Sequence, residues 1–299
     1  MSIRDANHRS ASAARYLDLL KKSLLNELYP ELEAQLLHTV LCLAHRQPVQ
    51  LDELWRARDN PQLLAAIREV RAGGDSFALR GLDANGKVID RPDLRNHTEF
   101  AHTMIGRLRL DHLQRLAEKA IADGIPGDFL EAGVWRGGAC VLLAGVLAAY
   151  EVRDRCVWVA DSFQGMPRPA RAEDAGWDMS ADVLPVLSVS EADVRQLFER
   201  YGLLDERIRF LPGWFKDSLP GCPVQQLALL RVDGDLYEST RDVLENLYAR
   251  VADGGYVIVD DYRSLPPCRQ AVEDFRAAHA IQAPLENIDG HAVFWRKGA

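Results

Sequence analysis

The sequence lacks several features that would assign a protein to a large class at once. No apolar run approaches the ~20 residues that a membrane span needs. The opening residues MSIR lead into polar sequence and not into the apolar segment of a signal peptide. The five cysteines are scattered, and no CxxC pair occurs among them. We therefore expect a cytoplasmic protein with reduced cysteines and no membrane partner.

Basic residues and nucleotide-binding motifs are also in short supply. With 36 Lys and Arg against 44 Asp and Glu, the net charge is −8, which argues against nucleic acid and anionic membranes as partners. The GxGxxG dinucleotide fingerprint is missing, and no phosphate-binding lysine follows the glycine-rich stretch that is present. What remains is an ordinary soluble composition in 299 residues, enough for one α/β domain of about 200 residues and additional helices.

Residues 227–262 form the most informative stretch, and their pattern predicts a strand, a helix and a second strand. A short apolar run at 228–232 predicts the first strand, and Ser239 begins a helix-like segment with a pattern close to a capping box. Asp253, Gly254 and Gly255 are predicted to end that helix before a second buried run at 256–259. A crossover of this length implies two parallel strands.

Two pairs of acids follow these strands. Asp233 and Asp235 come after the first strand, and Asp260 and Asp261 after the second. If the strands are neighbours, roughly 4.8 Å apart, the four carboxylates converge at the edge where α/β proteins bind ligands. Such acids raise one another's pKa unless a cation lies between them, and oxygen ligands suit Mg²⁺, Mn²⁺ or Ca²⁺. Asp is also a common turn and cap residue, but two clusters on successive strands favour a metal site.

A glycine-rich turn follows an earlier predicted strand. Residues 128–132 lead into EAGVWRGG at 131–138, where glycine lets the backbone approach a ligand and presents amide groups to anionic atoms. Gly137 and Gly138 have an alternative role in helix–strand packing alone. The next strand, at 155–160, ends at Asp161, where an acid is placed to accept hydrogen bonds from a ribose diol.

Three later segments complete the predicted fold. Residues 164–188 form a loop too long for a simple connector, which indicates a lid. A third strand at 207–211 is followed by Gly213 and Trp214, which are candidates for an adenine pocket, although Trp214 fits a core position nearly as well. The chain closes with two alternating runs joined by Asp289-Gly290, a type I′ hairpin signal. A mostly parallel sheet with a C-terminal antiparallel hairpin is typical of Rossmann-like class I methyltransferases.

The first hundred residues carry no recognisable chemistry. Helical patterns at 12–29, 31–45 and 61–72 predict an N-terminal helical cap or dimerisation layer. The predicted domains are therefore residues 1–99, a helical extension, and residues 100–299, the α/β domain.

Seven motifs, taken together and in this order, resemble the macrocin O-methyltransferase family, sugar O-methyltransferases of antibiotic tailoring. They are HTMIG, DFLEAGVWRGG, VADSFQGMP, LPGWFKDSLP, RVDGDLYEST, GGYVIVDDY and PPCRQAVEDFR. The resemblance covers about residues 100–297, and residues 16–29 resemble the N-terminal helix of the family. It implies S-adenosylmethionine as cofactor, Mg²⁺, a lid and a homodimer. The chain departs from the family at about 31–96, where members have a shorter connection, so the acceptor route and dimer contacts are open there.

The resemblance also implies site residues. The metal ligands would be Asp233, Asp260 and Asp261, with Asp235 as the general base or, alternatively, as a carboxylate that only hydrogen-bonds the ligands. The residues implied at the cofactor are Thr103, Met104, Glu131, Gly133, Asp161, Ser162, Gly213 and Trp214.

The reaction expected is Mg²⁺-dependent methylation of a hydroxyl, one of a vicinal diol on a sugar of a secondary metabolite. One alternative is the same chemistry on another acceptor, such as a catechol-like diol, an amino sugar or a modified peptide. Another is a catalytically silent binding module, which the intact acids disfavour. A nicotinamide-dependent oxidoreductase is disfavoured by the missing GxGxxG motif.

Overall fold

The computed structural model describes residues 3–72, 80–82, 88–90 and 100–298. They fall into two compact units. The first, which we call the sheet unit, comprises Met1–Leu17 and Arg109–Ala299; the second, the helical unit, comprises Asp18–Leu108. The predicted domain boundary at residue 99 lies outside the described residues. No helix in the described ranges is long and apolar enough to cross a lipid bilayer.

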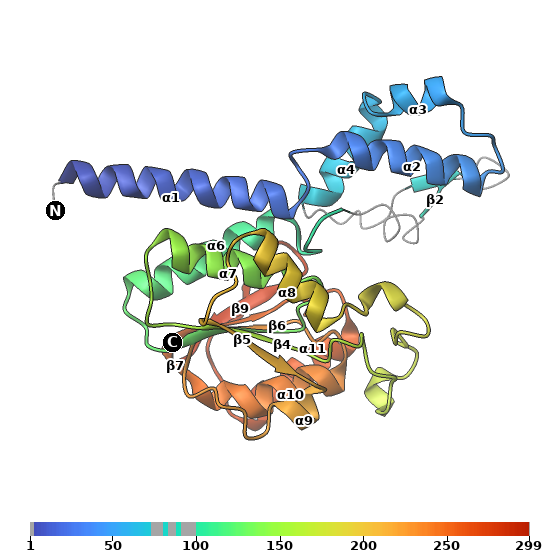
Figure 1. The fold of residues 1–299 in the computed structure, drawn as a ribbon. Helices are drawn as coiled ribbons and strands as arrows, with labels where there is room; N and C mark the ends of the chain where they lie inside the picture. Colours follow the sequence, from blue (N-terminus) through green and yellow to red (C-terminus); the bar gives the residue numbers. More distant parts are fainter. Residues whose placement is uncertain (1–2, 73–79, 83–87, 91–99, 299) are drawn as a thin grey trace. The chain divides into compact units, whose positions relative to one another are not determined.

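The sheet unit is built on one seven-stranded sheet within the described residues (Figure 1). In spatial order the strands are β5 (Ile208–Pro212), β4 (Val157–Asp161), β3 (Asp128–Ala132), β6 (Leu227–Val232), β7 (Val251–Val259), β9 (Val293–Arg296) and β8 (Glu286–Asn287). Neighbours from β5 to β7 pair in parallel, whereas β9 pairs antiparallel with both β7 and β8. This order confirms the predicted Rossmann-like class I methyltransferase fold with its antiparallel C-terminal strands.

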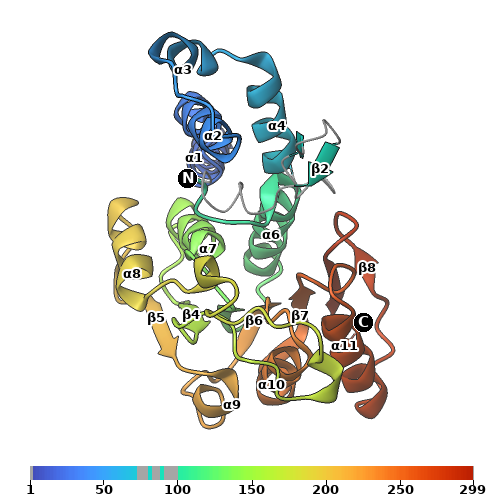
Figure 2. The same cartoon turned by 90° about the vertical axis from the view of Figure 1, so that its right-hand side faces the viewer.

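Helices cover both faces of this sheet (Figures 1 and 2). One face carries α6 (Gly106–Ala122), α7 (Gly138–Ala149) and α8 (Glu191–Arg200), and the other carries α9 (Phe215–Ser218), α10 (Tyr237–Leu247) and α11 (Pro266–Ala278). Strands covered on both faces need continuous apolar sequence, and β6 is accordingly buried at all six positions. Val243 and Leu244 of α10 and Trp295 of β9 are fully buried in one hydrophobic cluster, where each large side chain contributes about 1.5–3 kcal/mol.

The helical unit contains α2 (Pro30–Ala44), α3 (Leu51–Ala57), α4 (Pro61–Ala72) and the antiparallel pair β1 (Arg80–Leu82) and β2 (Val88–Asp90), while α1 (Ile3–Leu24) is divided between the units. Leu37 of α2 is buried against Leu63 and Ala66 of α4. Helices predicted at 31–45 and 61–72 are present, and α3 was not predicted. Whether this unit caps the site or forms a dimer contact stays a prediction.

Residues 253–255 were predicted to end a helix, and this prediction was wrong. They lie inside β7, which begins at Val251, and α10 has already ended at Leu247. The C-terminal segment holds them in the sheet, because Gly254 N donates to Lys297 O at 2.8 Å and Lys297 N donates to Gly255 O at 2.8 Å. The glycines therefore belong to an irregular strand start and not to a helix stop.

The type I′ turn predicted at Asp289-Gly290 is also wrong, although the hairpin itself is present. Residues 288–292 form a longer connection between β8 and β9. The Asp289 carboxylate accepts hydrogen bonds from His291 N and Ala292 N, both at 3.0 Å. This side-chain turn replaces the backbone turn that the Asp-Gly pair indicated.

Candidate active site

The predicted site residues in the sheet unit follow one another along the carboxyl edge of the parallel strands. Figure 2 views the sheet from this side. Glu131 and Asp161 lie at the ends of β3 and β4, and Asp233 and Asp260 directly follow β6 and β7. From β3 the chain first builds β4 and β5 on one side and then β6 and β7 on the other. The edge between β3 and β6 is thus a switch point, where open α/β sheets bind ligands.

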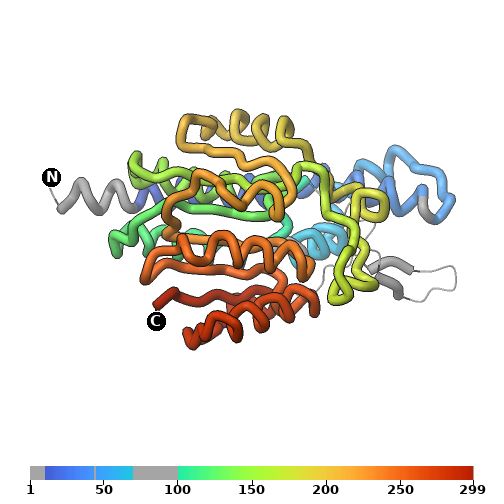
Figure 3. The backbone as a smooth tube through the Cα atoms, turned by 90° about the horizontal axis from the view of Figure 1, so that it is seen from below, coloured from blue at the N-terminus to red at the C-terminus, as the bar shows by residue number. Residues whose placement is uncertain are grey.

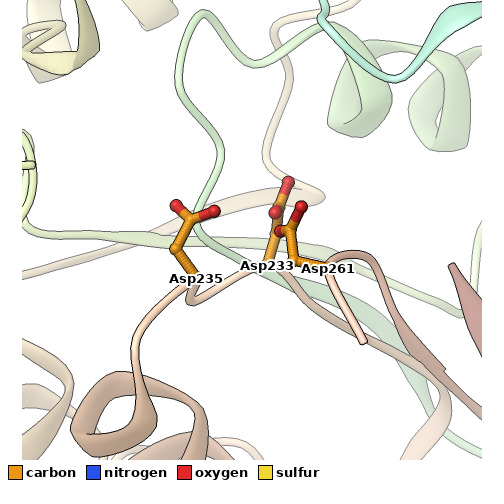
Figure 4. Close-up of side chains that lie close together, drawn as sticks. All are labelled: Asp233, Asp235 and Asp261. Carbon is orange, nitrogen blue, oxygen red and sulfur yellow. The ribbon is translucent and has the colours of Figure 1, made fainter. Parts of the chain in front are cut away.

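Three of the four acids come together. Asp233, Asp235 and Asp261 each place a carboxylate oxygen within 4.8 Å of the others, and their side chains face one another in Figure 4. Asp235 adopts a left-handed conformation, with φ of 55°, that turns it back toward the pair. Sequence alone gave no indication of this backbone geometry.

Burial and mutual repulsion perturb all three carboxyls. Burial, followed by the neighbouring Asp233, raises the pKa of Asp235 to about 7. Burial and the charges of Asp235 and Asp233 raise the pKa of Asp261 well above its usual range. The pKa of Asp233 is also raised, because burial outweighs the charge of Arg231. Oxygen-only donors that repel one another fit a hard divalent cation such as Mg²⁺.

The fourth acid, Asp260, has a different environment. Its side chain is buried, and both of its oxygens accept hydrogen bonds from guanidinium groups, one from Arg109 of α6 and one from Arg231 of β6. Burial raises its pKa, but the two cations outweigh that effect, and the net pKa is lowered. Among the described contacts Asp260 therefore differs from the other three acids in having two guanidinium partners. The metal roles of Asp233, Asp260 and Asp261 and the base role of Asp235 remain predictions.

Arg231 connects the acids of three strands. It is 2% exposed and forms ion pairs with Glu131, Asp233 and Asp260, the Asp233 pair at 2.8 Å. Glu131 also accepts a hydrogen bond from the Cys140 thiol at 2.8 Å, and burial raises its pKa to about 7 against the opposing charge of Arg231. Sequence reasoning missed Arg231, although a charge inside the run LALLRV was a signal. Arg109 had no comparable signal.

Gly133 brings the glycine-rich turn at 131–138, which we call the cofactor turn after its predicted role, against residues 233–235, which we call the acid turn. Its φ is 91°, and a Cβ atom there would lie 1.8 Å from the backbone oxygen of Asp233. Only glycine allows β3 and β6 to end this close together. Gly137 lies close to a helix, since its Cβ would meet Val194 of α8 at 2.7 Å, and its choice between a ligand role and helix–strand packing stays a prediction.

Asp161 lies at the end of β4, where the ribose of the cofactor is predicted to bind. Its carboxylate accepts hydrogen bonds from Val134 N at 2.8 Å and Phe163 N at 2.7 Å. Burial raises its pKa against the effect of these donors. Gly213 N donates to the backbone oxygen of Asp161 at 2.9 Å, which places the segment after β5 beside it.

The other predicted cofactor residues fall in different places. Ser162 is buried at the base of the loop after β4 and donates to Gly165 O at 2.7 Å. Trp214 is partly buried and precedes α9. Thr103 and Met104 belong to the helical unit, and their part at the cofactor stays a prediction.

The loop predicted to be a lid, residues 164–188, lies at the N-terminal end of α10 (Figure 3). We call it the lid segment. It contains two short 3-10 helices, η1 (Ala172–Asp174) and η2 (Pro185–Leu187). Trp135 of the glycine-rich turn donates its indole N–H to Val186 O at 2.9 Å.

Comparisons with known proteins agree on one family. A family model described as macrocin-O-methyltransferase (TylF) matches residues 13–297. Demethyldecarbamoylnovobiocin O-methyltransferase from Streptomyces niveus is 49% identical over 79% of this chain and 90% of its own length. The 8-demethyl-8-(2,3-dimethoxy-alpha-L-rhamnosyl)-tetracenomycin-C 4'-O-methyltransferase of Streptomyces olivaceus is 51% identical over 73% of this chain and 82% of its own. The solved structure of the O-methyltransferase NovP is 42% identical, with a TM-score of 0.74 over 96% of this chain and 100% of that one.

Proposed function

The chain belongs to the macrocin-O-methyltransferase family of S-adenosylmethionine-dependent O-methyltransferases, and from that premise we propose that it methylates a sugar hydroxyl of a secondary metabolite with the help of Mg²⁺. The name of the Streptomyces olivaceus relative specifies a rhamnosyl acceptor, and that of the Streptomyces niveus relative specifies a novobiocin precursor. Each relative is about half identical to this chain over most of both sequences. The names of the relatives therefore favour a related acceptor for this chain.

The observation that carries the metal part of the proposal is the convergence of Asp233, Asp235 and Asp261 within 4.8 Å. When bound, Mg²⁺ would lower the pKa of a coordinated acceptor hydroxyl, and a vicinal diol would offer it two such oxygens. We propose Asp233 and Asp261 as ligands. Asp260 is proposed as a third ligand, because each of its oxygens accepts one guanidinium hydrogen bond and has a second lone pair for a cation.

We assign the general base to Asp235. A base works best when its pKa lies near the operating pH, and the pKa of this carboxyl is raised to about 7. The carboxylate would accept the hydroxyl proton as the acceptor oxygen bonds to the methyl group and the bond from that methyl to sulfur breaks. The neighbouring Asp233 favours the protonated form of the base, because its charge raises the pKa of Asp235, whereas the hydrogen bond with Asp261 lowers that pKa.

The cofactor would lie along the ends of β3, β4 and β5. S-Adenosylmethionine, when bound, supplies the electrophilic methyl group. Glu131 and Gly133 are proposed at its methionine part, with Asp161 at the ribose and Gly213 and Trp214 near the adenine. The Gly213 amide already pairs with the backbone of Asp161, which supports a continuous adenosine pocket there. Thr103, Met104 and Ser162 complete the proposed set.

Substitution of the base tests the proposal. Asp235→Asn keeps the shape of the side chain but removes its capacity to take a proton. We expect the variant to bind S-adenosylhomocysteine like the wild type in a calorimetric titration and to lose at least about 100-fold in turnover. Treatment with EDTA should abolish wild-type turnover, and added Mg²⁺ should restore it.

Two outcomes would contradict the roles. An unchanged rate in Asp235→Asn would remove it as the base, and EDTA-insensitive turnover would remove the metal. A catechol-like diol or modified peptide as the better substrate in an acceptor screen would replace the sugar while keeping the chemistry. The homodimer is part of the same proposal, and a monomer in sedimentation equilibrium at micromolar concentration would contradict it.

A further inference from the structure

A buried carboxylate in the lid segment is not accounted for by cofactor, metal or acceptor. Asp174 is only 1% exposed, although loop residues normally lie on the surface. Its two oxygens accept hydrogen bonds from Tyr237 N at 2.6 Å and Glu238 N at 3.2 Å. These are the first two amides of α10, which have no partner within the helix.

Helix α10 has no side-chain cap of its own. Leu236 occupies the cap position, where serine, threonine, asparagine or aspartate would normally accept from these amides. Asp174 therefore caps the helix from 63 residues upstream in the sequence. Its negative charge at the positive end of the helix dipole, with two donors, accounts for a buried carboxylate without a cationic partner in the described contacts.

The capped turn of α10 also supports the acid turn. Gly234 lies between Asp233 and Asp235, and a Cβ atom there would stand only 3.1 Å from the backbone of Ser239 and Thr240. The acid turn thus packs directly on the first helical turn. Any movement of that turn would displace Asp235, whose backbone is already in the left-handed region with φ of 55°.

We propose that Asp174 is a positioning residue that locks the lid segment to the acid turn, so that undocking of the lid and loosening of Asp235 are a single event. Trp135 fastens the far end of the lid segment to the cofactor turn through Val186 at 2.9 Å. A docked lid segment then joins the cofactor turn and the base in one arrangement. The coupling is argued from these contacts alone, whereas its effect on turnover rests on the proposed function.

Hydrogen exchange of the full-length protein, without any ligand, tests the coupling. Asp174→Ala removes both acceptors, and Asp174→Asn keeps one carbonyl oxygen in a side chain of the same shape. The matched control is Asp182→Asn, which changes an exposed carboxylate of the same segment whose partner, Arg168, is also within the segment. Exchange is followed by mass spectrometry in peptides covering residues 164–188 and 233–240.

We expect about fivefold faster exchange in both peptides for Asp174→Ala, the size typical of a lost helix cap. A smaller increase in both is expected for Asp174→Asn, and none for Asp182→Asn. If Asp174→Ala does not fold, Asp174→Asn carries the comparison. Loosening of one peptide without the other, or of neither, would overturn the coupling.

Kinetic measurements distinguish a role of Asp174 in positioning Asp235 from a role in the stability of the loop alone. With a methylatable glycoside, Asp174→Ala should lower kcat by about tenfold or more, since small misplacements of a catalytic group are costly. Its affinity for S-adenosylhomocysteine should change less than kcat. An unchanged kcat in a protein whose two peptides both exchange faster would refute the positioning role. Because exchange needs no substrate, a failure of the sugar assignment leaves the exchange test intact.

Discussion

Replacement of Arg231 by methionine tests whether the buried charge network holds the site together. Arg231 is 2% exposed and pairs with three carboxylates, so the substitution leaves buried charge without its cation. The three carboxylates differ in the polar contacts that they keep once Arg231 is removed. Asp260 keeps Arg109, and Asp233, with a side chain 24% exposed, keeps access to water. Glu131, also 2% exposed, keeps only the Cys140 thiol among the described hydrogen bonds.

The expected loss is that of one broken buried ion pair, about 3–5 kcal/mol in the free energy of unfolding. This is a large part of the 5–15 kcal/mol typical of folded proteins. The matched control is Arg241→Met, which breaks a surface pair with Glu245 one helical turn away. Such pairs contribute about 0.3–0.5 kcal/mol. Urea unfolding of the three proteins, followed by circular dichroism, measures the difference.

The free energy of unfolding lost in Arg231→Met should also depend on pH, and the loss should be smaller at lower pH. Burial raises the pKa of Glu131 to about 7 against the opposing charge of Arg231, so removing that charge raises it further. The folded variant then binds a proton at pH values where the unfolded chain, with a pKa of about 4.5, does not. Its stability therefore rises as the pH falls from above 7 toward 4.5. Arg231→Met should be less damaging at pH 5 than at pH 8.

Two results would refute this reasoning. One is a loss below about 1 kcal/mol, which would mean that water or rearrangement replaces the guanidinium. The other is a loss of equal size at pH 5 and pH 8. The double variant Arg231→Met with Glu131→Gln should recover part of the loss, because it removes the unpaired charge.

Three further predictions concern single residues. Gly133→Ala should abolish S-adenosylhomocysteine binding or prevent folding, because its Cβ would lie 1.8 Å from Asp233 O; calorimetry showing wild-type affinity would contradict this. Asp161→Ala should weaken binding of the same ligand about tenfold, the size of a lost hydrogen bond to a charged group, and unaltered affinity would remove Asp161 from the ribose site. His112 is buried and its pKa is lowered to about 4, first by burial and then by Arg115, so the wild type should lose stability as the pH falls from about 6.5 to 4. His112→Asn should flatten that part of the stability profile, and an unchanged pH dependence would contradict the assignment.

The parallel strands were predictable because their signal is local. Burial on both faces demands continuous apolar runs, and the run at 128–132 matches β3 as observed. The acids at strand ends were predictable for the same reason, since parallel topology alone brings such ends to one edge. A repeated acid pair thus indicated the site before its geometry was known.

The start of α10 shows where local signals mislead. A pattern at Ser239 suggested a capping box, but the helix begins at Tyr237 and its cap is Asp174 of the lid segment. No sequence pattern links residues 63 positions apart. The placement of Asp260 could not be predicted either, because its partner Arg109 lies 151 residues away on α6. Contacts of this kind are set by tertiary packing.

The most direct test of the account is a calorimetric titration of S-adenosylhomocysteine, and then of Mg²⁺, into two proteins. One is the wild type, and the other is the double variant that carries both Asp233→Asn and Asp261→Asn. The account predicts that both proteins bind the cofactor product, and that only the wild type binds Mg²⁺ and turns over a glycosylated acceptor. Equal Mg²⁺ binding by the double variant, or Mg²⁺-independent turnover by the wild type, would contradict the central claim that these converging carboxylates form a catalytic metal site.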